Sequence, residues 1–194
     1  MNQDHQELIK NYFGKHIPLS DDALAFLTDH FKLKQHESRE LIVEAGAVAK
    51  YFYLVLEGVQ AIYMITDKGE KSIAGFSYQG EQSGVFDSFV TQKPSSLFLE
   101  AITPSRLIAI NKHDFDKLFE LFPEFYIWEA KFLEMILFGR LSRETEMLTY
   151  TAKEKFDAFM KRCPKELLDI PQKYLASYLN MKPETFSRLR ALRD

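Results

Sequence analysis

Cysteine is almost absent from this sequence: Cys163 is the only one in 194 residues. A single thiol cannot form an internal disulfide or hold an iron–sulfur cluster, and a reducing cytoplasm is the expected setting. The chain also has no run of about 18 apolar residues, and no basic segment leads into an apolar one. We therefore expect neither a membrane span nor a signal peptide.

Patterns that mark an enzyme or a metal site are missing too. No strand-like stretch contains His-x-His or His-x-x-His, which argues against a cupin-type enzyme with a bound metal. No nucleophile–base pair and no phosphate-binding glycine loop is recognisable. Five histidines could serve a haem, but none forms a diagnostic pair; they are His5, His16, His30, His36 and His113. The sequence thus predicts a protein that is not an enzyme and that needs no cofactor and no metal.

What the chain does have is a high apolar content and an uneven charge. Hydrophobic residues make up 46% of it and include 17 Phe, which indicates a substantial buried core. The net charge of −3 argues by itself against nucleic-acid binding. However, residues 149–194 contain ten Lys and Arg against six Asp and Glu, while residues 1–148 contain fifteen against twenty-two. This asymmetry predicts a basic, DNA-contacting end on an acidic regulatory body.

Periodicity divides the first part of the chain into helices and strands. Residues 4–13 and 20–31 are typical of helices, and Ser20 is a good N-cap for the second. Across residues 33–110 the apolar period is two, in seven or eight short runs separated by Gly, Pro and an Asp67–Gly69 turn. This spacing predicts two antiparallel sheets in a double-stranded β-helix, or jelly-roll, arrangement.

Further helices are expected at residues 112–121, 124–148 and 152–162. The long helix at 124–148 is apolar over most of its surface, which predicts burial on most sides. Two interpretations remain open. The helix can be a central core helix packed on the β-domain, or one of its faces can meet the same helix of a second subunit. We favour the second, because a two-fold protein reads an operator with two halves.

Residues 170–192 have the pattern of a helix-turn-helix. Leu175 and Leu179 share one face of a first short helix, and Ala176 is small enough to let a second helix cross closely. Asn180 falls at the tight turn, where φ must be positive and where Asn is tolerated best among non-glycine residues. The second helix begins near a proline and a glutamate that favour helix starts. Its inward residues are Met181, Phe186 and Leu189.

The polar residues of this motif are predicted to face outward and to bind DNA in the major groove. The forked donors of Arg188 match guanine O6 and N7, and Glu184 can accept from a cytosine amino group. Lys182, Thr185 and Ser187 are placed for phosphates, which fix register without reading sequence. The predicted DNA-binding residues are Gln172, Lys173, Lys182, Glu184, Thr185, Ser187, Arg188 and Arg190.

The order of an acidic β-domain, a long helix and a helix-turn-helix resembles the Crp/Fnr family of bacterial transcription regulators. The resemblance covers residues 33–192 and is strongest in the strand–glycine–strand signature and the approach to the ligand pocket. The similar stretches are residues 44–46, 51–58, 76–81, 84–86 and 97–110.

The resemblance implies an α+β fold in two parts. Residues 1–148 are expected to form a cyclic-nucleotide-binding-like effector domain that includes the dimerisation helix 124–148, with a hinge at 149–151. Residues 149–194 are expected to form the helix-turn-helix domain. The implied partners are double-stranded DNA, a second copy of the chain and an unidentified small-molecule effector, with RNA polymerase as a further candidate. No membrane partner is expected.

The predicted effector pocket departs from the cyclic AMP pattern of this family. Members that bind cyclic AMP have a Glu after the pocket glycine and an Arg-Ser pair for the phosphate, whereas those places hold Val85 and Ser95–Ser96. Two hydroxyls replace a charged, forked partner poorly, so we expect weak or no cyclic AMP binding. The pocket is predicted either to be more apolar or to be filled by side chains. Its predicted residues are Gly84, Val85, Phe86, Ser95, Ser96 and Phe98, with Leu97 beside them.

The leading interpretation is a dimeric, sequence-specific DNA-binding regulator. The alternative is a small-molecule sensor that acts through protein contacts without binding DNA. Only two residues follow Leu192, where members of the family often have a two-stranded wing. Either the wing is absent or the sequence stops short of it, and we then expect DNA affinity to depend more on Arg188, Arg190 and nearby lysines.

Overall fold

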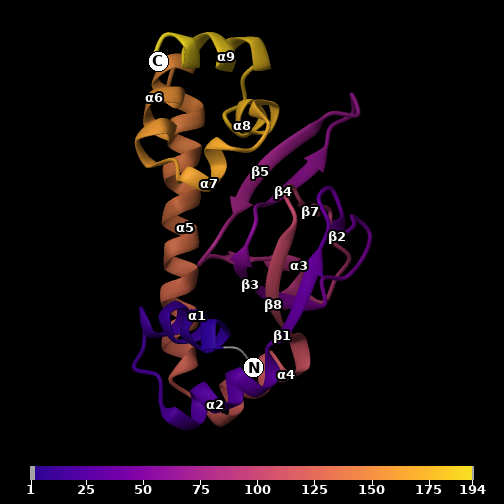
Figure 1. The fold of residues 1–194 in the computed structure, drawn as a ribbon, viewed down its shortest axis with the longest axis vertical. Helices are drawn as coiled ribbons and strands as arrows, with labels where there is room; N and C mark the ends of the chain where they lie inside the picture. The colour runs from indigo at the N-terminus through magenta and orange to yellow at the C-terminus, as the bar shows by residue number, and fades with distance from the viewer. Residues whose placement is uncertain (1–2, 194) are drawn as a thin grey trace.

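The computed structural model describes residues 3–193 and consists of a β-roll with helices along one side and at both ends (Figure 1). The strands are β1 (Lys32–His36), β2 (Leu41–Val43), β3 (Tyr51–Glu57), β4 (Gln60–Ile65), β5 (Lys71–Ser77), β6 (Gln82–Ser83), β7 (Phe98–Ala101) and β8 (Ser105–Asn111). The helices are α1 (Gln3–Gly14), α2 (Asp21–His30), α3 (Phe86–Thr91), α4 (Lys112–Leu121), α5 (Phe125–Thr149), α6 (Ala152–Arg162), α7 (Lys165–Leu168), α8 (Gln172–Tyr178) and α9 (Pro183–Ala191).

The strands form two four-stranded antiparallel sheets, in the orders β1-β8-β3-β6 and β2-β7-β4-β5. The predicted α+β fold is thereby confirmed, including the hairpin between β4 and β5, where Gly69 has a φ of +77°. The sequence did not predict the short strand β6 or helix α3, which follow one another at residues 82–91.

Helix boundaries follow from side-chain caps. Ser20 accepts a hydrogen bond from the amide of Ala23 at the start of α2. Thr151 opens α6 with a capping box, in which its hydroxyl accepts from the amide of Glu154 while the Glu154 carboxylate accepts from the amide of Thr151. Such caps pair amide groups that the first turn of a helix leaves without a partner. The long helix α5 ends at Thr149, and α6 starts three residues later, at Ala152.

An aromatic core joins the N-terminal helices, the β-roll and the first half of α5. Trp128 is fully buried there. Its ring centroid lies 4.9 Å from that of Phe13 on α1 and 5.1 Å from that of Phe132 on α5. Phe52 on β3 and Phe115 on α4 belong to the same cluster. Offset and tilted ring pairs of this kind stabilise a core beyond their buried area, so α5 is fixed firmly to the roll at this end.

The prediction that α5 is buried on most sides is wrong for the single chain. Four of its residues are buried, namely Phe125, Trp128, Phe132 and Glu146. Large apolar side chains on its other face are exposed to solvent: Tyr126, Ile127, Leu133, Leu137, Phe138, Leu141 and Leu148. An exposed apolar face of this length indicates a surface that contacts another molecule.

The C-terminal helices α6–α9 pack on one face of the sheet β2-β7-β4-β5 and close the upper end of the molecule (Figure 1). Tyr63 on β4 and Ile73 on β5 share a core cluster with Phe156, Leu175 and Phe186 of these helices. The helix-turn-helix is thus docked on the β-roll and is not suspended from α5 alone.

A second tie joins α6 to the end of α5. The guanidinium of Arg162 donates two hydrogen bonds to the carboxylate of Glu146, at 2.5 and 2.6 Å. Glu146 is buried, and its carboxylate raises the pKa of Arg162 above its ordinary value. This two-bond geometry fixes direction as well as distance, so it bridges the break at Tyr150.

Among residues 3–193, no helix combines the length and the apolar character that a membrane crossing needs.

Candidate DNA-binding and effector sites

Helices α8 and α9 form the predicted helix-turn-helix geometry. Leu175, Ala176, Leu179 and Phe186 are fully buried. Asn180 has a φ of +51°, as the turn requires, and its amide donates to the carbonyl of Ser177 at 3.0 Å. The turn thus directs α9 away from α8 and leaves the start of α9 at the surface, with Pro183 in its first turn.

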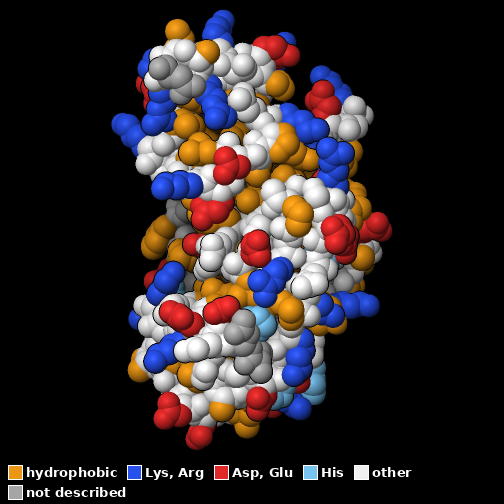
Figure 2. Space-filling view, in the orientation of Figure 1, with side chains coloured by type: hydrophobic (Ala, Val, Ile, Leu, Met, Phe, Trp, Pro, Cys, Tyr) orange, Lys and Arg blue, Asp and Glu red, His pale blue; other side chains and the backbone are white. Residues whose placement is uncertain are grey.

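The side chains predicted to bind DNA fall into two groups. Lys173, Lys182, Glu184, Ser187 and Arg188 are exposed, whereas Gln172, Thr185 and Arg190 are half-buried. Figure 2 shows Lys and Arg side chains gathered over the C-terminal helices at the top of the molecule. The exposed group on α9 presents both charge and hydrogen-bonding atoms without obstruction from this chain.

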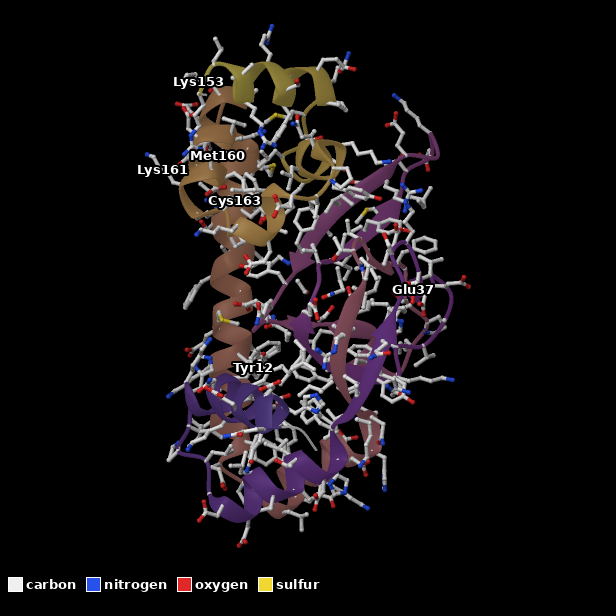
Figure 3. All side chains as sticks on the ribbon, in the orientation of Figure 1. Tyr12, Glu37, Lys153, Met160, Lys161 and Cys163 are labelled. Atoms are coloured by element: carbon white, nitrogen blue, oxygen red, sulfur yellow. The ribbon has the colours of Figure 1, made fainter. Side chains whose placement is uncertain are left out.

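Arg190 belongs to the inner group because it lies toward α6. It and Arg193 are close enough to Cys163 that their charges lower the pKa of this thiol, although burial dominates and raises that pKa above its ordinary value. Cys163 lies at the end of α6, close to Met160 (Figure 3). The structure therefore separates Arg190 from Arg188, which the sequence had placed on the same outer surface.

A cavity of about 660 Å³ lies between the two sheets, α3 and the middle of α5. Its walls are largely apolar and come from Phe52, Ile62, Phe76, Phe89, Phe132 and Ile136. Three of the predicted pocket residues, Gly84, Val85 and Phe86, line this cavity together with Leu97. The cavity is large enough for a small organic ligand, because such sites measure about 300–1,000 Å³. The space at this place is therefore not filled by side chains.

The other three predicted pocket residues, Ser95, Ser96 and Phe98, lie outside this cavity. Ser95 is buried and ties its own loop together: its amide donates to the carbonyl of Ala47 at 2.8 Å and its hydroxyl donates to the carbonyl of Leu97. Phe98 stacks on Tyr63 with ring centroids 5.2 Å apart, on the face of the sheet that meets the C-terminal helices. Leu99, the next residue of β7, lies opposite Ile62, which lines the cavity, and successive residues of a strand point to opposite faces, so Phe98 faces away from the cavity.

Polar groups that the sequence did not single out line the cavity instead. Ser83 of β6 is 3% exposed, and its hydroxyl oxygen has no hydrogen-bond partner within residues 3–193. Arg143 of α5 is half-buried, and its Nε also has no partner among those residues. Gln82 lies beside them and accepts a hydrogen bond from the hydroxyl of Tyr12 at 3.2 Å. Tyr12 comes from α1 at the lower end of the roll (Figure 3), and burial raises its pKa well above the ordinary value.

Arg143 contacts the helix-turn-helix as well as the cavity. One terminal nitrogen, Nη2, donates to the carbonyl of Tyr178 at 2.8 Å and to that of Ile73 at 3.5 Å. The guanidinium carbon lies 4.5 Å from the centroid of the Tyr178 ring, a cation–π distance. Nothing in the local sequence of α5 reveals this role, because it depends on where β5 and α8 are brought together.

Within residues 3–193, no group of three or more His, Cys, Asp and Glu side chains could hold a metal ion.

Comparison with known proteins agrees with this architecture. Residues 33–121 match the family model of the cyclic nucleotide-binding domain. No curated protein matches the sequence. Among solved structures, the chain is similar to FixK2 from Bradyrhizobium japonicum, with 18% identity, a TM-score of 0.73, and 84% of this chain and 83% of that chain covered.

Two further solved structures have the same fold. The c-di-GMP-responsive global regulator CLP of Xanthomonas campestris is 18% identical, with a TM-score of 0.69 over 90% of this chain and 92% of that chain. The catabolite activator protein of Thermus thermophilus is 17% identical, with a TM-score of 0.56 over 90% of this chain and 83% of that chain. Residues 33–121 thus match the cyclic nucleotide-binding domain model, and the chain as a whole shares the fold of these three solved structures.

Proposed function

We propose that this protein is a dimeric, sequence-specific DNA-binding transcription regulator whose β-roll senses a small molecule. The observation that carries the proposal is the exposed polar face of α9, on a helix-turn-helix whose turn and core have the required geometry. A recognition helix contacts base edges with residues near its N-terminus. Glu184 and Arg188, four residues apart, lie on one exposed side of α9 and are the proposed base contacts.

The remaining exposed polar residues serve the phosphates in this proposal. Lys182 immediately precedes α9, and Lys173 lies in the first turn of α8. Lysines in these places supply charge and position without reading sequence. Ser187 adds a neutral hydrogen-bonding group. Half-buried Thr185 and Gln172 contribute less, and Arg190 contributes least because it lies toward Cys163.

The exposed face of α5 is proposed to join two chains. Leu133, Leu137 and Leu141 are spaced four residues apart, and Leu148 follows one heptad later, so all four lie on one side of the helix. Phe138, 64% exposed, flanks them. Packing two such faces against each other would bury this apolar surface and produce a two-fold axis. A two-fold dimer presents two copies of α9 to successive major grooves, as a two-half operator requires.

Selection of bound fragments from random duplexes, followed by titration of the selected site, tests the DNA-binding part. Replacing Arg188 by Ala should weaken specific binding by about 1–3 kcal/mol and flatten the base preference at one position. Replacing Lys182 by Ala should weaken binding to all sequences and lower the salt slope by about one unit. Lys161→Ala is the matched control, since Lys161 is exposed on α6, away from α9 (Figure 3).

Enrichment of one motif by the wild-type protein and the expected loss in Arg188→Ala support the proposal. A wild-type protein that selects no sequence contradicts it, as does an Arg188→Ala variant that binds the selected site like the Lys161→Ala control. Either result would favour the alternative of a sensor that acts through protein contacts.

A further inference from the structure

The cavity between the sheets and α5 contains two polar atoms whose lack of a partner the fold itself does not explain. Ser83 and Arg143 both line the cavity, and the Ser83 hydroxyl and the Arg143 Nε are each buried without a hydrogen bond among the described residues. Buried polar groups in native proteins nearly always have a partner, and a group left alone destabilises the structure. Two such groups on one cavity indicate that a bound molecule supplies the missing acceptor.

The rest of the cavity defines what else that molecule carries. The walls next to the two polar groups are apolar and include Phe86 and Phe132, whose ring centroids lie 5.0 Å apart. A ligand that satisfies Arg143 must therefore have an apolar body as well as an acceptor group. An uncharged apolar molecule would leave the guanidinium edge without a partner. A cation would be repelled by it.

The charge around the cavity favours a single negative charge over two. Arg143 has one open donor edge here, because its Nη2 already donates to Tyr178 and Ile73. Asp87 and Arg140 both line the cavity from exposed positions and offset each other in charge, while Ser95 and Ser96, which occupy the phosphate places of the related pattern, lie outside the cavity. A planar carboxylate matches one guanidinium edge plus one hydroxyl, whereas a phosphate requires more donors.

We propose that the cavity binds a monocarboxylate with an apolar body, whose carboxylate accepts hydrogen bonds from Arg143 and Ser83. The proposal rests on the proposed role of the β-roll as the sensor of the regulator. Arg143 then links the ligand to the DNA-binding part directly. A carboxylate that accepts from Nε binds the same guanidinium whose Nη2 donates to Tyr178 of α8.

Octanoate, 1-octanol and octyl phosphate are suitable probes, because they share one apolar chain and differ in the head group. Binding is measured on the full chain without DNA, by calorimetry and by the fluorescence of the sole tryptophan. Trp128 is stacked on Phe132, which lines the cavity, so a ligand there changes its surroundings. Octanoate should bind saturably, and both other probes should bind at least about tenfold more weakly, since the charged hydrogen bonds are lost or mismatched.

Single substitutions test whether Arg143 and Ser83 contact the carboxylate of octanoate. Arg143→Gln should weaken the binding of octanoate by about tenfold or more and leave the binding of 1-octanol unchanged. Ser83→Ala removes the second donor and leaves the contact between Arg143 and Tyr178 in place. It should weaken the binding of octanoate severalfold. Lys117→Gln is the control, because it also removes one positive charge but Lys117 is exposed on α4 and does not line the cavity, so its loss should change binding less than twofold.

The proposal is overturned if octanoate and 1-octanol bind equally, if octyl phosphate binds more tightly than octanoate, or if Ser83→Ala and Arg143→Gln both bind octanoate like the wild type. Should Arg143→Gln fail to fold, Ser83→Ala decides alone. Because no DNA is present, these outcomes are independent of the duplex selection. A protein that selects DNA but ignores octanoate refutes the ligand class only, and one that binds octanoate but selects no DNA refutes the DNA-binding role only.

Discussion

The hydroxyl of Ser177, on the first helix of the helix-turn-helix, accepts a hydrogen bond from the backbone amide of Ile73 on β5 at 3.1 Å. The same hydroxyl donates to the carbonyl of Lys71 at 2.8 Å. Strand β5 is an edge strand of its sheet, so its outward amide and carbonyl groups have no neighbouring strand. The Ser177 side chain pairs with these groups in place of a neighbouring strand, and α8 is thereby attached to the β-roll.

Replacing Ser177 by Ala should loosen this attachment. Two hydrogen bonds disappear, and the free energy of unfolding should fall by about 1–3 kcal/mol, since each bond contributes about 0.5–1.5 kcal/mol. The amide of Ile73 should also exchange with solvent faster in hydrogen-exchange measurements. Ser187→Ala is the control, because Ser187 is exposed on α9. Unchanged exchange at Ile73 in the Ser177 variant would show that the apolar cluster alone holds α8 in place.

Replacing Leu141 by Asp should disrupt the proposed dimer. The side chain is 49% exposed in the single chain and lies in the leucine stripe of α5, so a charge there would be buried between two helices without a partner. Sedimentation analysis should show a monomer for this variant and a dimer for the wild type. Ser142→Asp adds the same charge one residue later, to an exposed position off the stripe, and should stay dimeric. A monomeric wild type would disprove the assembly.

Cyclic AMP should bind weakly or not at all. Val85, which replaces the acidic residue of the cyclic AMP pattern, is fully buried and offers no acceptor to a ribose hydroxyl. Ser95 uses its hydroxyl on its own loop. Arg143 lines the cavity, but its Nη2 already donates to the carbonyls of Tyr178 and Ile73, so a buried phosphate finds too few free donors there. Calorimetric titration measures this, and a dissociation constant in the micromolar range or tighter would contradict it.

The stability of the fold should decrease as the pH falls below about 6.5, the ordinary pKa of histidine. His5 of α1 is buried, and neither ring nitrogen has a hydrogen-bond partner among residues 3–193. Burial and, secondarily, the positive charge of Arg106 lower the pKa of His5, although Asp4 opposes this. The unfolded chain then binds the proton more readily than the folded one, so acid favours unfolding.

Urea unfolding at about pH 7.5 and about pH 5.5 measures this effect, because those values lie on either side of the unfolded pKa. His5→Leu should show a smaller loss of stability between the two than the wild type. His113→Gln, at an exposed position of α4, should behave like the wild type. Equal losses in all three proteins would mean that other groups determine the acid sensitivity.

The helix-turn-helix could be predicted closely because its signals are local. Apolar spacing, a small residue and a turn residue with φ > 0 lie within about twenty consecutive positions, and Asn180 has the conformation they require. Strand β6 could not be predicted, because it has two residues and exists only through pairing with β3, where Ser83 lies opposite Tyr53. Helix α3 was missed because its N-cap, Val85, has no capping side chain.

The cavity was located from the sequence but its polar groups were not. The predicted residues Gly84, Val85 and Phe86 line it, since they are the pocket glycine and the two residues that follow it. Phe98 could have been excluded, because it and Leu97 are neighbours on a strand-like run and cannot face the same side. Arg143 could not have been found, since its partners Ile73 and Tyr178 are far from it in sequence.

The two bonds between Arg162 and Glu146 determine where the molecule can bend. They span the break at Tyr150 and hold α6 against the last turns of α5. Rotation of the backbone at Tyr150 and Thr151 alone would break both bonds. Upstream, Gly139 is a softer point, since glycine favours a helix by about 1 kcal/mol less than alanine and a side chain there would meet open space. Gly139 also lines the cavity. Bending of α5 is therefore expected beside the cavity, ten residues before the helix ends.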